Sequence, residues 1–198
     1  MADQHRVICL SKHKYGEADL ILRLISSHGE VFSAIAKSAL KSRRRFGGGV
    51  LEPTHHMNIT LSRPFNSAGA TERLPVLVEA QLIDDFSKLK TDYDRLNLAL
   101  EFVRMVATVA REGDSHRELF NLLGHALKSA EVSDDPLLLK VQFQIKLLHM
   151  QGMLPPEEKF LPFTKTPIRE HKLIGELLPH WRELTSEAQS YIDSYVQG

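Results

Sequence analysis

The chain has very little cysteine. Cys9 is the single cysteine among 198 residues, and it lies in the apolar run Val7–Leu10. One thiol can form neither an internal disulfide nor a zinc site built on cysteines. A small buried hydrophobe is therefore the expected role of Cys9. This cysteine usage fits the reducing cytoplasm, where we expect the protein.

A long apolar run is also missing. No stretch approaches the roughly 18 consecutive apolar residues that cross a bilayer. Met1–Arg6 leads into no apolar core of the kind that a secretory signal has. The apolar fraction of 42% and the charged fraction of 25% are ordinary for a globular protein. We therefore expect neither a membrane partner nor secretion.

Recognisable catalytic and metal-binding patterns are lacking as well. Gly47–Gly49 has neither the Gly-Lys-Ser/Thr ending of a phosphate-binding loop nor the spacing of a dinucleotide fingerprint. His55 and His56 are neighbours on an expected strand, so they point to opposite faces and are poorly placed to share a metal. No serine has the context of a nucleophile elbow. We expect no enzymatic activity, no metal and no cofactor.

The formal charge sums to zero, but it is distributed unevenly. Residues 1–80 carry 11 Lys and Arg against 7 Asp and Glu, whereas residues 81–198 carry 14 against 18. This asymmetry between the two parts of the chain is informative, whereas the net charge of zero is not. The first part is expected to attract phosphate, and the second to repel it except at local patches.

One short segment gathers positive charge. Between Lys37 and Arg45 the chain has five cations and no acid, and Phe46 and Gly47–Gly49 follow directly. The segment lies between two expected strands, so we expect it on a loop. Concentrated positive potential favours a polyanion, above all the phosphate backbone of a nucleic acid, and an ordinary solvated loop is the alternative. The five cations are Lys37, Lys41, Arg43, Arg44 and Arg45.

Residues 1–83 show short runs in which apolar and polar side chains alternate. This period of two, without a long helix between the runs, predicts a small antiparallel barrel of five strands. On the last strand we expect Val78, Ala80 and Leu82 to form the apolar face. The expected strands are Val7–Lys12, Asp19–Ser26, Glu30–Lys37, His55–Ser62 and Val76–Ile83.

From residue 84 the apolar period becomes that of helices, so residues 84–198 are expected to form an all-helical domain and the fold class is α+β. The first helix has an apolar stripe that includes Leu96 and Leu100, and we expect it to be the central one. Asp135-Pro136 reads as an N-cap followed by proline at the first helical position. Prolines predict irregular structure over residues 155–179. The expected helices are Tyr93–Glu112, one capped by Ser115, one from Asp135 to Gly152, and Ser186–Val196.

Five-stranded barrels of this size bind nucleic acids through a charged groove that follows the backbone, with aromatic rings on which bases stack. Because few rings accompany the cations here, we expect phosphate contacts to dominate and sequence specificity to be low. The candidate DNA-binding residues are Lys12, Lys14, Arg23, Lys37, Lys41, Arg43, Arg44 and Arg45. Further loop residues of interest are the cations Arg63 and Arg73 and the aromatic residues Tyr15, Phe46 and Phe65.

Two groups of motifs occur in a set order. The expected barrel contains Tyr15-Gly16-Glu17-x-Asp19-Leu20, His28-Gly29-Glu30-Val31, Ala36-Lys37-x-Ala39, Lys41-Ser42-Arg43 and Leu51-Glu52-Pro53. The expected helical domain contains Glu118-Leu119-Phe120-Asn121-Leu122-Leu123, Ala126-Leu127 and Phe143-x-x-Lys146-Leu147-Leu148-x-x-x-Gly152-x-x-Pro155. Over roughly residues 5–156, this order resembles the family of the bacterial DNA repair protein RecO.

The resemblance implies an OB-fold at 1–83 and a helical, partner-binding domain at 84–198. It implies a recombination mediator that binds single- and double-stranded DNA, anneals complementary strands and helps to load a recombinase. The implied partners are a RecR-like protein and the acidic C-terminal tail of single-stranded DNA-binding protein. The implied location is the cytoplasm, in association with the nucleoid.

Three departures from the family pattern bear on these expectations. Glu157–Phe160 stands where many members carry a cysteine zinc motif, so a zinc-free and shortened member is expected. Ser38 replaces a glycine that usually follows the lysine of the third strand. Val141-Gln142 replaces an arginine pair in the tail-binding region, which leaves Lys140 and Lys146 as candidate partner-binding residues.

Two other functions remain open from the sequence. In one, the protein is an adaptor whose helical domain is the working surface and whose basic segment is incidental. In the other, the barrel binds structured RNA instead of DNA. Competition between RNA and single-stranded DNA of equal length would separate the nucleic-acid alternatives, and partner binding that survives neutralisation of the basic segment would favour the adaptor.

Overall fold

The computed structural model describes residues 2–62, 74–110 and 117–197. The chain divides into two compact units, one made of Met1–Asp85 and Ala110–Phe120, the other of Phe86–Val109 and Asn121–Gly198. The expected domain boundary, between residues 83 and 84, lies two residues before the division after Asp85. The expected functions of the two domains, DNA binding and partner binding, stay predictions. Among the described residues, no helix combines the length and hydropathy needed to span a membrane.

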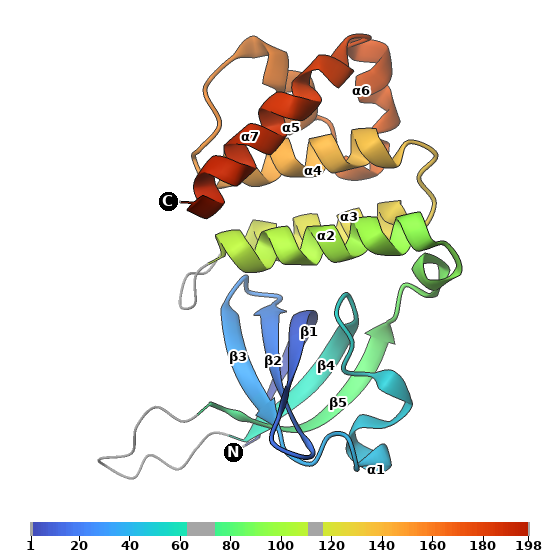
Figure 1. Cartoon of the computed structure of the whole chain (residues 1–198), viewed down its shortest axis with the longest axis vertical. Helices are drawn as coiled ribbons and strands as arrows, with labels where there is room; N and C mark the ends of the chain where they lie inside the picture. Colours follow the sequence, from blue (N-terminus) through green and yellow to red (C-terminus); the bar gives the residue numbers. More distant parts are fainter. Residues whose placement is uncertain (1, 63–73, 111–116, 198) are drawn as a thin grey trace. The chain divides into compact units, whose positions relative to one another are not determined.

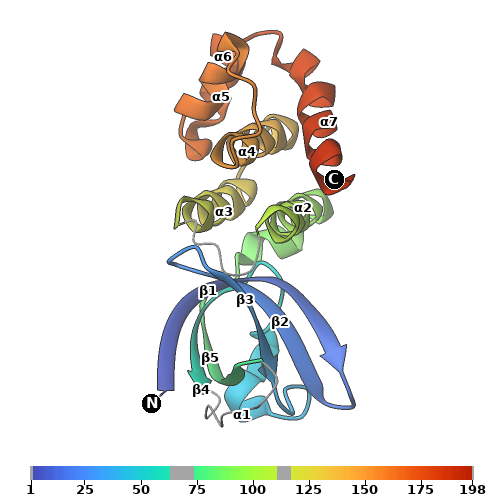
Figure 2. The same ribbon diagram turned by 90° about the vertical axis from the view of Figure 1, so that its left-hand side faces the viewer.

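The first unit contains a closed barrel whose strands follow the order β1-β2-β3-β5-β4 around the wall (Figures 1 and 2). All neighbours are antiparallel except β3 and β5, which are parallel and meet at Ile35 and Val76. This is the topology of an OB-fold, so the expected fold class, an α+β chain with an N-terminal OB-fold barrel followed by helices, is confirmed. The strands are β1 (Ala2–Tyr15), β2 (Asp19–Ser26), β3 (Val31–Ala36), β4 (His56–Ser62) and β5 (Val76–Asp84).

Strand β1 is more than twice as long as the sequence pattern predicts. Its first part, from Ala2 to Ile8, pairs with β4, and its second part, from Val7 to Tyr15, pairs with β2. The register shifts between Cys9 and Ser11, where a bulge bends the strand from one neighbour to the other. Apolar and polar residues do not alternate at the two ends of β1, so the sequence pattern misses them. The full length of the strand is seen only from its pairing with β4 and β2.

Strand β5 corrects one expectation about the core. Leu77 and Ala80 are buried, whereas Val78 and Leu82 are 38% and 43% exposed. Thr60 pairs with Glu79 and the next residue of β4 pairs with Leu77, so Val78 is an extra residue in the ladder. A bulge of this kind shifts the alternation by one residue, so Leu77 and Ala80 share the buried face and Val78 does not. The predicted apolar face of Val78, Ala80 and Leu82 is therefore wrong.

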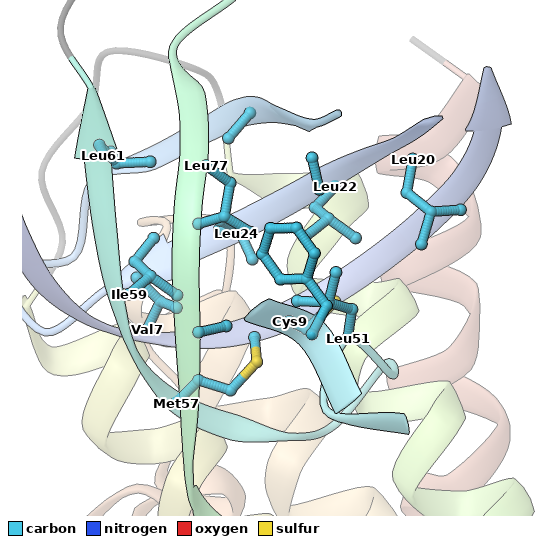
Figure 3. Packing of buried hydrophobic residues seen from close by; sticks show 14 residues of the cluster. Val7, Cys9, Leu20, Leu22, Leu24, Leu51, Met57, Ile59, Leu61 and Leu77 are labelled. Carbon is cyan, nitrogen blue, oxygen red and sulfur yellow. The ribbon is translucent and has the colours of Figure 1, made fainter. Parts of the chain in front are cut away.

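The barrel encloses an apolar core (Figure 3). Cys9 lies inside it, fully buried, and burial raises the pKa of its thiol to about 12. The thiol therefore stays protonated near neutrality, as expected for a buried hydrophobe. The residues labelled in Figure 3 are Val7, Cys9, Leu20, Leu22, Leu24, Leu51, Met57, Ile59, Leu61 and Leu77.

The second unit is helical, and its most enclosed element is α4 (Pro136–Met150), which contacts α2, α5 and α7 (Figure 1). Its buried residues lie on all sides, including the polar Gln142 and Gln144. The expected N-cap is confirmed, because the Asp135 carboxylate accepts a hydrogen bond from the Leu138 N–H at 3.0 Å and Pro136 follows. The predicted central helix was α2 (Tyr93–Val109), which is wrong: Leu96 and Leu100 are only half-buried there.

The proline-containing segment is more regular than expected. Short helical turns succeed one another after residue 157, and Pro162 occupies the first turn of one of them, where its missing N–H has no partner to lose. Helix α3 (Arg117–Ala130) begins in the first unit and continues into the second. The remaining helices of the second unit are α5 (Leu161–Lys165), α6 (Lys172–Leu177) and α7 (Leu184–Gln197). The 3-10 turns of this unit are η2 (Ser87–Thr91), η3 (Glu158–Phe160), η4 (Ile168–Glu170) and η5 (Trp181–Glu183). The predicted cap Ser115 and the predicted helix end Glu112 lie outside the described residues.

Candidate nucleic-acid interface

The basic segment Lys37–Arg45, called the basic loop below, is not a loop throughout. Residues 37–41 form a turn, α1 (Arg43–Phe46) follows, and the 3-10 turn η1 (Gly47–Gly49) comes next. Phe46 is buried and belongs to the barrel core. The expected loop is thus anchored at its far end by an apolar side chain, with the cations presented just before it.

The start of the basic loop is held by a neighbouring turn. Ser38 has a backbone φ of 56°, in the left-handed region that favours glycine. Its N–H donates a hydrogen bond to the Asp19 carboxylate at 2.7 Å, and the Leu40 N–H donates to the Ala18 carbonyl at 3.0 Å. These bonds offset the cost of the left-handed conformation and explain how a serine is accommodated where a glycine was expected. No pattern in the sequence indicates this anchoring role of Asp19, because the two residues are 19 positions apart.

Arg45 closes the basic loop. Its guanidinium donates to the Lys37 carbonyl through Nη2 at 2.8 Å and to the Ser42 hydroxyl through Nε at 3.1 Å. Its charged end also lies 5.1 Å from the centre of the Phe46 ring, within cation–π range. Arg45 is half-buried. It therefore positions the other cations and is itself less available to a ligand.

The other four cations of the basic loop are exposed. Within residues 2–62, 74–110 and 117–197, none of them forms an ion pair with a carboxylate. Four positive side chains on one short segment raise the local potential and attract phosphate. They are Lys37, Lys41, Arg43 and Arg44.

The flanking cations differ from one another. Lys14 is exposed, at the end of β1. Lys12 pairs with the Glu52 carboxylate, which offsets its charge. Arg23 is half-buried, and its Nη2 donates to the Ala110 carbonyl at 2.9 Å, so its expected role in DNA binding stays a prediction. Arg63 and Arg73 lie outside the described residues.

The aromatic candidates separate in the same way. Tyr15, the last residue of β1, is 57% exposed. Phe46 is 6% exposed and is therefore a core residue, not a surface on which a base could stack. Phe65 falls in the part of the chain that is not described.

The candidate lysines of the helical unit already have partners within that unit. Lys140 pairs with Glu101 at 2.8 Å. The Lys146 ammonium donates to the Thr164 carbonyl at 2.7 Å, and burial lowers its pKa. Gln142, which stands in place of one arginine of the family's pair, is buried, and its side-chain amide donates to the Phe163 and Thr166 carbonyls. A role for Lys140 and Lys146 in holding an acidic tail stays a prediction.

An ion-pair cluster occupies the segment in which the resemblance suggested a cysteine motif. Lys159 lies 2.9 Å from the Glu157 carboxylate and 2.9 Å from the Glu187 carboxylate, which belongs to α7. The hydrogen bonds to Glu187 and Glu157 raise the pKa of Lys159. Among the described residues, no group of three His, Cys, Asp or Glu side chains is placed to hold a metal ion. The zinc-free expectation itself stays a prediction.

Comparison with known proteins points to one family. Residues 1–84 match the family model described as "Recombination protein O N terminal". The chain is 29% identical over 150 residues to the DNA repair protein RecO of Maridesulfovibrio salexigens, covering 76% of this chain and 58% of that protein. It is 30% identical over 151 residues to the RecO of Syntrophobacter fumaroxidans, covering 76% and 57%. For the RecO of Desulfosudis oleivorans the identity is 29%, covering 75% and 55%. The chain thus spans little more than half the length of these relatives.

Proposed function

The chain belongs to the RecO family, and from this premise we propose that its barrel binds DNA without sequence preference through the basic loop. The relatives are named as DNA repair proteins, and a role in DNA repair is part of the proposal. Binding includes both single-stranded and double-stranded DNA, because the contacts are made to phosphates.

One observation carries the proposal. Lys37, Lys41, Arg43 and Arg44 are exposed and unpaired among the described residues, and Arg45 holds the segment that presents them. A group of cations that meets a phosphate backbone releases the counterions condensed on it, and this release supplies most of the affinity in non-specific binding. An isolated surface lysine would neutralise only one phosphate and contribute correspondingly less.

The composition of the basic loop supports low sequence specificity. Base edges are read mainly by bidentate contacts from rigidly placed Arg, Asn, Gln, Asp or Glu side chains in a groove. Between Lys37 and Arg45 there is no Asn, Gln, Asp or Glu, and the arginine with the most fixed side chain, Arg45, is used within the protein. The free cations therefore suit phosphates, whose positions repeat along any sequence.

Strand annealing follows from the same electrostatics. Two complementary strands repel each other through their phosphates, and a basic surface that contacts both lowers this repulsion so that base pairing can proceed. No covalent step is required. We propose that the protein promotes annealing in this way and assists recombinase loading, with a RecR-like protein and the acidic tail of single-stranded DNA-binding protein as partners.

The test is DNA binding across a salt series with the full chain. The variant carries Lys41→Gln, Arg43→Gln and Arg44→Gln and keeps Arg45, so that the loop retains its internal hydrogen bonds. Three lost phosphate contacts should reduce the slope of log affinity against log salt by about two units for single strands and slightly more for duplex. Affinity should fall similarly for unrelated sequences, and annealing of complementary oligonucleotides should slow.

A matched control removes the same charge elsewhere. Arg104→Gln, Lys165→Gln and Arg169→Gln change three exposed cations of the helical unit and should leave the slope unchanged. Equal effects of the two triple variants would refute the basic loop as the contact. Tighter binding to structured RNA than to single-stranded DNA of equal length would replace DNA by RNA as the ligand. If the protein binds no nucleic acid at all, the adaptor function is favoured.

A further inference from the structure

An exposed tyrosine stands beside the basic loop. Tyr15 ends β1 and pairs with Asp19, the first residue of β2. Tyr15 is 57% exposed, so its ring faces solvent and does not belong to the apolar core that the closed barrel surrounds. It lies at the turn between β1 and β2, one of the places where five-stranded barrels of this kind bind oligonucleotides.

Backbone register places Tyr15 near the cations. Leu20 pairs with Ala36, so the residues on either side of this pair, Asp19 and Lys37, lie across from each other. The hydrogen bond from Ser38 to Asp19 confirms this closeness. Tyr15 and Lys37 are thus separated by two strand spacings, about 10 Å. A nucleic-acid strand on the basic loop therefore passes within reach of the ring.

The surface next to the ring is suited to bases. His13 shares a strand face with Tyr15, because the two are two residues apart on β1. His13 pairs with Ile21, which pairs with Ile35, and both isoleucines are half-buried in the same row of the sheet. This row offers an apolar surface beside an exposed aromatic ring.

The turn itself is unsuited to phosphate. Glu17 lies in it and Asp19 follows it as the first residue of β2, and Tyr15–Asp19 contains no Lys or Arg, although the exposed Lys14 directly precedes Tyr15. Two carboxylates repel a phosphate but not the face of an uncharged base. Phosphate binding and base binding are therefore divided between two adjacent segments, the basic loop and the turn that starts at Tyr15.

We propose that Tyr15 stacks on an unpaired base of a DNA strand whose phosphates lie on the basic loop, so that the barrel binds single-stranded DNA more tightly than duplex. This inference rests on the proposed function. A base in a duplex is stacked on its neighbours and hydrogen-bonded to its partner, so it cannot present a free face to the ring. Stacking on one aromatic side chain is largely independent of sequence, in keeping with phosphate-driven binding.

The test compares three ligands of equal length: a single-stranded oligonucleotide, the corresponding duplex and an abasic strand with the same phosphates. Tyr15→Ala should weaken binding of the single-stranded oligonucleotide by about tenfold. It should leave binding to the abasic strand and the slope of the salt series unchanged. Tyr15→Phe should behave as the unmodified protein, because the ring is kept. Tyr93→Ala removes another exposed tyrosine, 82% exposed in the helical unit, and should have no effect.

The outcomes separate this inference from the proposed function. Equal weakening of the oligonucleotide and the abasic strand by Tyr15→Ala would mean that the ring supports the loop, and would overturn the inference. So would a loss with Tyr15→Phe as large as that with Tyr15→Ala. If the triple variant of Lys41, Arg43 and Arg44 keeps the full salt slope, it is the proposed function that fails, whatever Tyr15→Ala does.

Discussion

The guanidinium of Arg45 donates a hydrogen bond to the backbone carbonyl of Lys37 at 2.8 Å, so the last cation of the basic loop is bound to the first residue of it. The same guanidinium reaches Ser42 through Nε. A charge that was expected to face a ligand is thereby used to shape the segment that carries the other charges. A mutation of Arg45 can therefore keep its positive charge while removing the hydrogen bonds that shape the basic loop.

Arg45→Lys keeps the charge but cannot form both hydrogen bonds, because a lysine has no fork of donors. We expect the affinity for single-stranded DNA to fall about fivefold, which corresponds to about 1 kcal/mol, the usual net contribution of one hydrogen bond. The slope of the salt series should stay the same. Fluorescence anisotropy at several salt concentrations measures both quantities. Affinity equal to that of the unmodified protein would show that Arg45 has no positioning role.

Glu52→Gln removes the carboxylate that pairs with Lys12. The freed ammonium is expected to contact one more phosphate, so affinity should rise at low salt and the slope should steepen by about 0.7 units for single strands. A slope that does not change would place Lys12 outside the contact surface. Glu30→Gln is the matched control, since Glu30 is an exposed carboxylate that forms no ion pair among the described residues.

Phe46→Leu tests whether the second aromatic residue of this region takes part in binding. Because Phe46 is buried in the barrel core, the change should lower the free energy of unfolding by about 1 kcal/mol, as for other hydrophobic replacements of similar volume. DNA affinity should stay within about twofold. Urea unfolding and anisotropy measure the two effects. A base-dependent loss of affinity like that expected of Tyr15→Ala would contradict the buried position.

Lys159→Met removes both ion pairs that join residues 157–159 to α7. We expect a lower thermal midpoint, because Glu157 and Glu187 are left near each other without a cation between them. The difference should narrow at high salt, which screens exposed charges. Lys165→Met changes an exposed lysine of the same unit and should have little effect. Equal midpoints for the two variants would show that the cluster does not stabilise the unit.

His171 gives the helical unit a dependence on pH. Its Nε2 lies 2.8 Å from the Ser133 hydroxyl and its Nδ1 lies 3.2 Å from the Ile168 carbonyl. A carbonyl only accepts, so Nδ1 carries the proton and Nε2 accepts from Ser133. Burial lowers the pKa of His171 below its ordinary value of 6.5, and Lys172 lowers it further, while the hydrogen bond to the Ile168 carbonyl and the charges of Asp135 and Asp134 act in the opposite direction.

A lowered pKa means that the unfolded chain binds a proton first as the pH falls. The free energy of unfolding should therefore decrease as the pH drops below about 6.5, until the folded protein is protonated as well. His171→Gln cannot titrate there, so its deficit relative to the unmodified protein should be larger at about pH 7.5 than at about pH 5.5. Urea unfolding at both values provides the test. A deficit that does not vary with pH would mean that His171 contributes only by packing.

The sequence predicted the parts of the fold that depend on local period. Strand β2 begins and ends where the alternation of Leu20, Leu22 and Leu24 does, and the Asp135 cap starts α4 as expected. The concentration of cations before Phe46 was also visible, because it is a property of consecutive residues. These features follow from side chains within a few positions of one another, so no knowledge of distant contacts is needed.

Only the tertiary structure decided which of those cations are available. Arg23 meets Ala110 and Lys12 meets Glu52, pairs that are far apart along the chain, and Arg45 folds back on Lys37. Bulges, enclosure and ion pairs likewise decided which face of β5 is apolar and which helix is most enclosed. The physical reason is that burial and pairing depend on the neighbours that folding brings together, which no periodicity along the chain records.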